Sequence, residues 1–206
     1  WQSISDPRDY VLGMAERFRA GGGEITITRA ERLVAGGVET SDGMIPGCVV
    51  LAAGAHSHHL ALTAGAKIPL ETERGYNTTL PAGAFDLKRQ ITFGGHGFVI
   101  SKVGDGLRVG GAVELGGLDL PPNFARADAM LKKVKRFLPE LDTSGGTQWM
   151  GFRPSLPDSL PAIGALPNRA DVFCAFGHGH LGLTQSAGTA AIIANLLTGQ
   201  DPSIDL

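Results

Sequence analysis

The sequence has few cysteines, no long apolar run and no excess of basic residues. Cys48 and Cys174 both lie in apolar stretches, which predicts buried free thiols and a reducing, cytoplasmic location. No stretch approaches the ~20 consecutive apolar residues that a membrane-spanning helix needs. The chain has 18 Lys and Arg against 20 Asp and Glu, and this balance argues against nucleic acid as a partner.

Glycine is the residue type in clear excess. The 206-residue chain has 43% hydrophobic residues and 30 glycines, so glycine is about twice as frequent as its usual ~7%. The glycines stand in short turns beside apolar segments, which indicates tight backbone packing in a globular protein. The chain begins at Trp1 rather than at methionine, and we expect it to continue from a longer protein.

The first third of the chain predicts helix, hairpin, strand and helix. Apolar spacing predicts a helix over residues 7–20, followed by β-rich residues 24–34. A hairpin arm should turn at Asp42-Gly43. The apolar run 48–53 is typical of a central strand, and a short helix should cover 57–64.

The rest of the chain predicts an antiparallel sheet, a helix, strands and a final helix. Residues 68–118 alternate short strands with glycine turns. A helix should cover 123–138 with Asn123 as its cap, strands should follow within 147–176, and a helix over 183–198 should end at Gly199. The fold class is therefore α+β, mixed, without the strand, glycine turn and helix that open a dinucleotide-binding domain.

The segment 177–182 has the bare spacing of a dinucleotide fingerprint, G-x-G-x-x-G. Its wider context does not fit, because the helix that follows runs to the chain end without a second parallel strand. Two interpretations stay open. One is a glycine turn that only packs a helix on a strand. The other is a turn that lets a ligand approach backbone N–H groups at a helix N-terminus.

The segment GFRPSLPDSLPAIG (151–164) carries Arg153 on a stiff backbone, since three prolines within it forbid a helix. A guanidinium on such a backbone suits bidentate binding of a carboxylate. The alternative is a structural ion pair, for which Asp158 is the nearest acidic residue in sequence.

Two further groups of polar residues have less specific spacing. The histidines at 56, 58, 59, 178 and 180 have no Cys, Asp or Glu at a usual ligand spacing, so we expect no metal site. The stretch 71–76, which contains Glu73, has the composition of a solvated charged turn.

The order of these motifs resembles the FAD-dependent amine and amino-acid oxidoreductases, closest to the small subunit of D-amino acid dehydrogenases. Glycine oxidase and sarcosine oxidase are more distant relatives. The matching stretches are VVLAAGAHS (49–57), KIPLETERGYN (67–77), GLRVGGAVELGGLD (106–119), QWMGFRPSLPDSLPAIG (148–164) and FGHGHLGLT (176–184). The resemblance implies the C-terminal half of a flavoenzyme, with an N-terminal half of the same protein as partner.

The resemblance also implies a domain plan and a set of site residues. Residues 1–66 and 148–206 would belong to the FAD-binding domain, and residues 67–147 would form a substrate domain whose sheet covers the flavin. Arg153 would hold the substrate carboxylate, with Tyr76 and Glu114 also lining the substrate site. The implied cofactor-binding residues are Ala30, Ala53, Gly54, Gly177, His178, Gly179, His180, Leu181, Gly182, Leu183 and Thr184.

The implied activity is oxidative deamination of a small D-amino acid. Noncovalent FAD would take a hydride from the substrate, and the resulting imine would hydrolyse to a 2-oxo acid and ammonia. A respiratory-chain electron acceptor, reached peripherally at the inner membrane, is the expected partner for reoxidation. Alternatives are a glycine- or sarcosine-oxidase-like enzyme, covalent flavin attachment, and a non-catalytic binding module.

Overall fold

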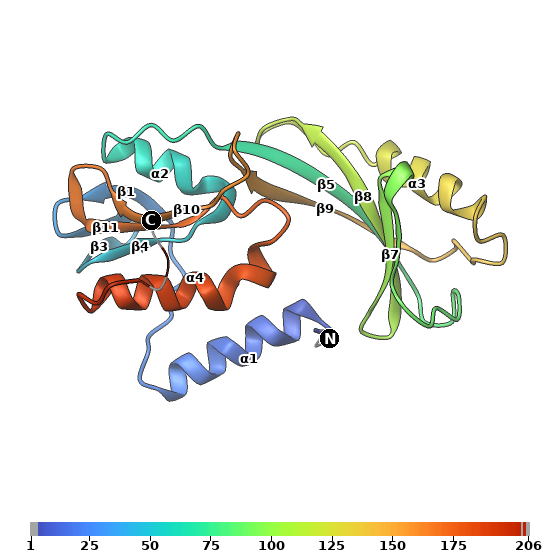
Figure 1. Cartoon of the computed structure of the whole chain (residues 1–206), viewed down its shortest axis with the longest axis horizontal. Helices are drawn as coiled ribbons and strands as arrows, with labels where there is room; N and C mark the ends of the chain where they lie inside the picture. The colour runs from blue at the N-terminus through green and yellow to red at the C-terminus, as the bar shows by residue number, and fades with distance from the viewer. Residues whose placement is uncertain (1–3, 203, 205–206) are drawn as a thin grey trace. The chain divides into compact units, whose positions relative to one another are not determined.

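The fold is described from a computed structural model, for residues 4–202 and Ile204 (Figure 1). The chain divides into two compact units. The first unit contains the segment ending at Thr26, residues 74–114 and residues 121–151. The second contains residues 27–73, residues 115–120 and the described chain from Phe152 onward. Each unit has its own hydrophobic core, and the predicted functional boundaries near 66 and 147 stay a prediction.

The first unit is built on a five-stranded sheet with the order β6-β7-β8-β5-β9. Its strands are β5 (Glu71–Leu80), β6 (Ile91–Phe93), β7 (Phe98–Val103), β8 (Gly106–Leu115) and β9 (Thr147–Ser155). The start of β5 up to Glu73 and the end of β9 from Phe152 are counted with the second unit. β7 pairs antiparallel with both β6 and β8, and Ile100 lies opposite Val109. The antiparallel sheet predicted for 68–118 is therefore confirmed. β9 adds an edge strand from a distant part of the sequence.

One face of this sheet is covered by α3 (Ala125–Lys135) (Figure 1). Ala127, Met130 and Val134 are buried on α3 at spacings of three and four residues, as an amphipathic helix requires. The prediction that Asn123 caps this helix is wrong. The cap position is Phe124, no side chain caps the helix, and the backbone N–H of Asn123 donates to Tyr76 instead.

The first unit also contains the predicted N-terminal helix α1 (Pro7–Ala20). A carboxylate oxygen of Asp6 accepts a hydrogen bond from the Arg8 backbone N–H at 2.7 Å, and Pro7 occupies the first helical turn. Both features are typical of a helix start, because the first N–H groups lack partners within the helix.

The second unit contains two three-stranded sheets. One is an antiparallel meander of β1 (Ala30–Val34), β2 (Gly37–Thr40) and β3 (Gly43–Pro46). The other has the order β10-β11-β4 and consists of β4 (Val49–Leu51), β10 (Ala162–Leu166) and β11 (Arg169–Phe176). β10 and β11 are antiparallel, whereas β4 runs parallel to β11.

Two predictions for residues 48–53 are wrong. β4 is an edge strand among the described residues, because its only neighbour there is β11; an apolar pattern reports burial and not the number of paired neighbours. Cys48 is exposed, since it precedes the buried part of the strand, while Cys174 on β11 is buried as predicted.

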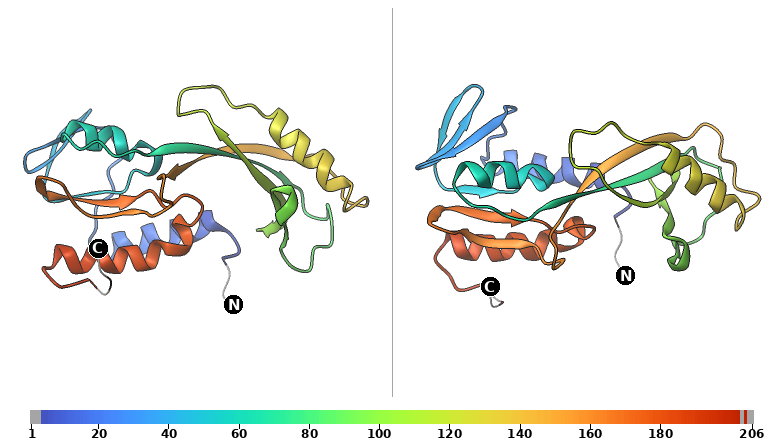
Figure 2. Two further views of the ribbon diagram at one scale, coloured as in Figure 1. Left: turned by 45° about the horizontal axis from the view of Figure 1, so that its top comes forward. Right: turned by 90° about the horizontal axis from the view of Figure 1, so that it is seen from above.

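Two helices cover opposite faces of the β10-β11-β4 sheet, α2 (Ser57–Thr63) on one and α4 (Gly182–Leu197) on the other (Figures 1 and 2). A short 3-10 turn, Gly54–His56, leads into α2. The helix α4 ends just before Gly199, whose φ of +69° suits glycine. Among the described helices, none has the length and apolar composition needed to cross a membrane.

Candidate functional site

The turn that joins β11 to α4 requires glycine at two positions. Gly177 has a φ of +88° and Gly179 a φ of +53°, a left-handed conformation that L side chains rarely adopt. A Cβ on Gly177 would also lie 2.9 Å from Leu156 Cδ1. The Gly179 N–H donates to the Pro154 carbonyl at 2.8 Å, which ties the turn to the end of β9.

The N-terminus of α4 follows this turn and has no side-chain cap. The cap position is Leu181, and the 16-residue helix begins at Gly182. The first-turn N–H groups, from Gly182, Leu183 and Thr184, have no acceptor within a helix. Together with the helix dipole they favour an electron-rich ligand atom at this end.

A cavity of about 210 Å³ opens at the turn, entirely within the second unit. Its lining residues are Glu73, Ser155, Leu156, Ser159, Gly177, His178, Gly179, His180 and Leu181. His180 Nε2 lies 3.3 Å from Glu73 Oε2, and His178 Nε2 lies 2.9 Å from the Thr189 hydroxyl. Burial lowers the pKa of His178, which favours its neutral form at physiological pH.

Arg153 lies in the extended end of β9, as its proline-rich context predicted. Burial lowers the pKa of its guanidinium, and the negative charge of Glu73 partly offsets that effect. Both residues belong to the second unit. Arg153 directly precedes Pro154, whose carbonyl accepts the Gly179 N–H, and Glu73 lines the cavity at the turn, so a basic and an acidic residue lie beside the glycine turn.

Ala30, the residue expected to reach the adenine side of FAD, lines a second cavity in the same unit, whereas Ala53 and Gly54 are not part of its lining. Ala30 begins β1, while Ala53 and Gly54 lie at the start of the 3-10 turn, where Gly54 has a φ of +56°. A cavity of about 530 Å³ brings Ala30 together with the end of that turn. Its lining is Arg29, Ala30, Glu31, His56, His59 and Leu60.

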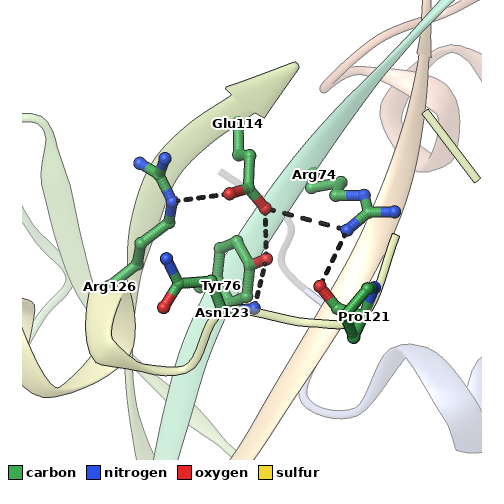
Figure 3. Close-up of polar contacts among 6 residues, drawn as sticks. All are labelled: Arg74, Tyr76, Glu114, Pro121, Asn123 and Arg126. Atoms are coloured by element: carbon green, nitrogen blue, oxygen red, sulfur yellow. Dashed lines mark hydrogen bonds and ion pairs between the residues drawn. The ribbon is translucent and has the colours of Figure 1, made fainter. Parts of the chain in front are cut away.

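Tyr76 and Glu114 belong to the first unit and contact each other there (Figure 3). The Tyr76 hydroxyl donates to Glu114 Oε2 and accepts the Asn123 backbone N–H at 3.0 Å. Arg126 Nε donates to Glu114 Oε1 at 3.0 Å. Arg74, fully buried, donates from Nη1 to the Pro121 carbonyl at 3.3 Å.

This network contradicts the solvated-turn interpretation of residues 71–76, since the segment is a strand with Arg74 and Tyr76 buried. The hydrogen bond from Tyr76 is the main cause that lowers the pKa of Glu114, followed by the effects of Arg126 and Arg74. Sequence patterns missed Arg74 and Arg126, because nothing in their spacing indicates a shared carboxylate. The role of Tyr76 and Glu114 at the substrate stays a prediction.

Among the residues that the structure describes, no three His, Cys, Asp or Glu side chains form a group that could hold a metal ion. The histidines of the glycine turn instead contact a threonine and a glutamate.

Comparison with known proteins assigns the chain to a family. The model of the FAD dependent oxidoreductase family matches residues 2–196. A D-amino-acid oxidase of Bradyrhizobium diazoefficiens is 36% identical over 98% of this chain and 50% of that protein. A D-amino acid dehydrogenase of Paramagnetospirillum magneticum is 39% identical over 82% of this chain and 41% of that protein.

A solved structure shares the fold. Glycine oxidase from Bacillus cereus superposes with a TM-score of 0.79 at 21% identity, covering 94% of this chain and 56% of that one. The chain thus spans about half the length of the two curated relatives described above. From the family match over nearly its whole length, this chain belongs to the FAD dependent oxidoreductase family.

Proposed function

We propose that this chain is the C-terminal half of an enzyme that oxidatively deaminates D-amino acids with noncovalent FAD. The observation that supports this best is the cavity at the glycine turn, which Glu73 lines beside the uncapped start of α4. Arg153 directly precedes Pro154, whose carbonyl accepts the Gly179 N–H of the same turn. The names of the two curated relatives support amino acids of D configuration as the substrate class. The half-length match supports an N-terminal half as partner, which would carry the missing dinucleotide-binding unit.

The residues of the second unit fit a flavin. The left-handed glycines 177 and 179 let a flat ring approach the backbone closely, since neither carries a Cβ. The first-turn N–H groups of α4 suit the carbonyl and ring nitrogen atoms that become electron-rich when flavin is reduced. The cavity at Ala30 would take part of the nucleotide. Cys174 is buried, and Cys48 is not among the residues that line the cavity at the glycine turn. Neither thiol is therefore placed to bond to the flavin ring, which supports noncovalent binding.

The chemistry that bound FAD supplies is acceptance of a hydride from the substrate Cα. This chain's contribution is orientation. Arg153 binds both carboxylate oxygens in one plane and so fixes the direction of the Cα–H bond. Such positioning can be worth several of the ~7–11 kcal/mol available from proximity and orientation. The oxidised substrate, an imine, then hydrolyses to a 2-oxo acid and ammonia.

The second candidate function is a glycine- or sarcosine-oxidase-like amine oxidase. It is supported by the likeness of the fold to glycine oxidase, which at 21% identity extends to the fold alone. If the enzyme is a dehydrogenase, we propose that it passes its electrons to a respiratory-chain acceptor. This would require a cytoplasmic location, peripheral at the inner membrane. A non-catalytic binding module is the alternative from another class.

A substrate screen separates these functions. The full-length protein is incubated with D-amino acids, L-amino acids, glycine, sarcosine and D-proline, with a dye acceptor and separately with oxygen. The proposal predicts turnover of D-amino acids with release of a 2-oxo acid. Turnover of glycine and sarcosine alone would favour the second candidate, and the absence of both flavin and turnover would favour a binding module.

A further inference from the structure

We propose that Glu73 and His180 receive the α-ammonium group of the substrate, with Glu73 binding it and His180 taking its proton. The proposal rests on the proposed function and assigns Glu73 and His180, two of the polar side chains that line the glycine-turn cavity and that contact each other. Glu73 is a binding residue in this account, and His180 is a general base.

The charges around the cavity match an amino acid zwitterion. The carboxylate and the ammonium of an α-amino acid are attached to the same carbon. A site that binds both groups must therefore present a cation and an anion close together. Arg153 and Glu73 provide this pair, because Arg153 precedes Pro154, whose carbonyl accepts the Gly179 N–H, and Glu73 lines the cavity at the same turn. The negative charge of Glu73 also acts on the Arg153 guanidinium. Glu73 lines the cavity itself, and a substrate held by Arg153 would bring its ammonium to the next polar group.

The proposed oxidation requires the proton to leave. An ammonium nitrogen has no lone pair to stabilise the carbon that loses a hydride, so the reactive form of the substrate is the neutral amine. The N–H bond of the ammonium breaks, and the proton forms a new N–H bond on the His180 imidazole. The amine keeps the electron pair, and the imidazole becomes imidazolium.

The geometry of His180 suits this transfer and the release that follows. Its Nε2 lies 3.3 Å from Glu73 Oε2, so the carboxylate orients the imidazole ring. The His180 side chain is 58% exposed, and its proton can pass to water. Two other charged or titratable groups are related to Glu73: Arg153 from β9, on whose guanidinium its charge acts, and His178 from the turn, which lines the same cavity.

The test is the pH dependence of kcat/KM for a D-amino acid, measured on the full-length protein with FAD bound. His180→Asn should lower kcat/KM at neutral pH by about 100-fold or more. Activity should return toward the wild-type value at alkaline pH, above the pKa of the substrate's own ammonium, because the free amine then needs no base. Glu73→Gln should mainly raise KM. A purely structural role would give a loss that alkaline pH does not rescue.

Glu71→Gln is the matched control, since Glu71 is an exposed carboxylate two residues from Glu73 and bonds only to the neighbouring Thr72 backbone in the described contacts. It should leave the profile unchanged. Flavin absorbance and melting temperature report whether each variant is folded. If Glu73→Gln does not fold, His180→Asn still tests the proposal, because the His180 side chain is largely exposed. If the wild type oxidises D-amino acids but His180→Asn keeps the wild-type profile, this inference alone is overturned. An inactive wild type overturns the proposed function as well.

Discussion

The Tyr76 hydroxyl joins two segments of the first unit, because it donates to Glu114 on β8 and accepts the backbone N–H of Asn123 ahead of α3. The side chain of Tyr76 is only 1% exposed, so both bonds are sheltered from water. The contact with Asn123 holds the segment ahead of α3 against the sheet (Figure 3).

Removing this hydroxyl should destabilise the protein. Tyr76→Phe leaves the Asn123 N–H without its partner, and we expect a loss of about 1–3 kcal/mol in the free energy of unfolding. Urea unfolding of the full-length protein measures it. Tyr10→Phe is the control, because Tyr10 is exposed on α1, and it should change stability little. Equal stability of the two variants would show that the bond contributes nothing.

The lowered pKa of Glu114 should make stability depend on pH. Its folded-state pKa lies below the unfolded value, so the ionised carboxylate contributes stability above the unfolded pKa, and this contribution is lost as pH falls through the folded pKa. Glu114→Gln should therefore be less stable than wild type at neutral pH, with a difference that shrinks below the ordinary glutamate pKa of about 4.3. Chemical unfolding at several pH values measures this, with the exposed Glu140→Gln as control. A difference independent of pH would contradict the assigned cause.

Gly177 should be intolerant of a side chain. Gly177→Ala combines a φ of +88° with a Cβ placed 2.9 Å from Leu156, and we expect a cost of about 1–3 kcal/mol and weaker FAD binding. Gly188→Ala, in the interior of α4 with open space around its Cβ, should stabilise the helix by up to about 1 kcal/mol. Flavin fluorescence titration and thermal melts distinguish the two. Unchanged affinity in Gly177→Ala would remove the turn from the flavin site.

Arg153 should affect turnover more than stability. In the full-length protein, Arg153→Met should keep FAD and fold, while kcat/KM falls by roughly 10²–10⁴-fold, which corresponds to about 3–5 kcal/mol. Arg153→Lys should recover only part of the loss, because an ammonium cannot contact both carboxylate oxygens in one plane. A lower melting temperature with unchanged kcat/KM would instead indicate a structural ion pair.

Periodicity and turn residues predicted much of the fold. Local patterns predicted three elements that the structure contains: the helix over 7–20, the antiparallel sheet within 68–118 and the helix before Gly199. Long-range pairings were not predictable in this way. β9 pairs with β5, about 70 residues earlier in the sequence. The apolar pattern of a strand does not indicate which other strand it pairs with.

The candidate site was predicted unevenly for a similar reason. The glycine turn has a local signature and lies where its spacing predicted, between β11 and α4. The pairing of Glu73 with His180 has no such signature, because 107 residues separate them and only the folded second unit brings them together. Cys48 shows the converse error, since an apolar neighbourhood in sequence did not bury it.

The most direct test of the account is anaerobic reduction of the full-length protein by a D-amino acid. The protein is purified, and its flavin is released by denaturation to show that FAD is noncovalently bound. A D-amino acid is then added without oxygen while the visible flavin absorbance is followed. The account predicts bleaching of the flavin band with one 2-oxo acid formed per flavin, and no bleaching with the L-enantiomer. A flavin that stays oxidised with every D-amino acid, or a protein that binds no FAD, would contradict it.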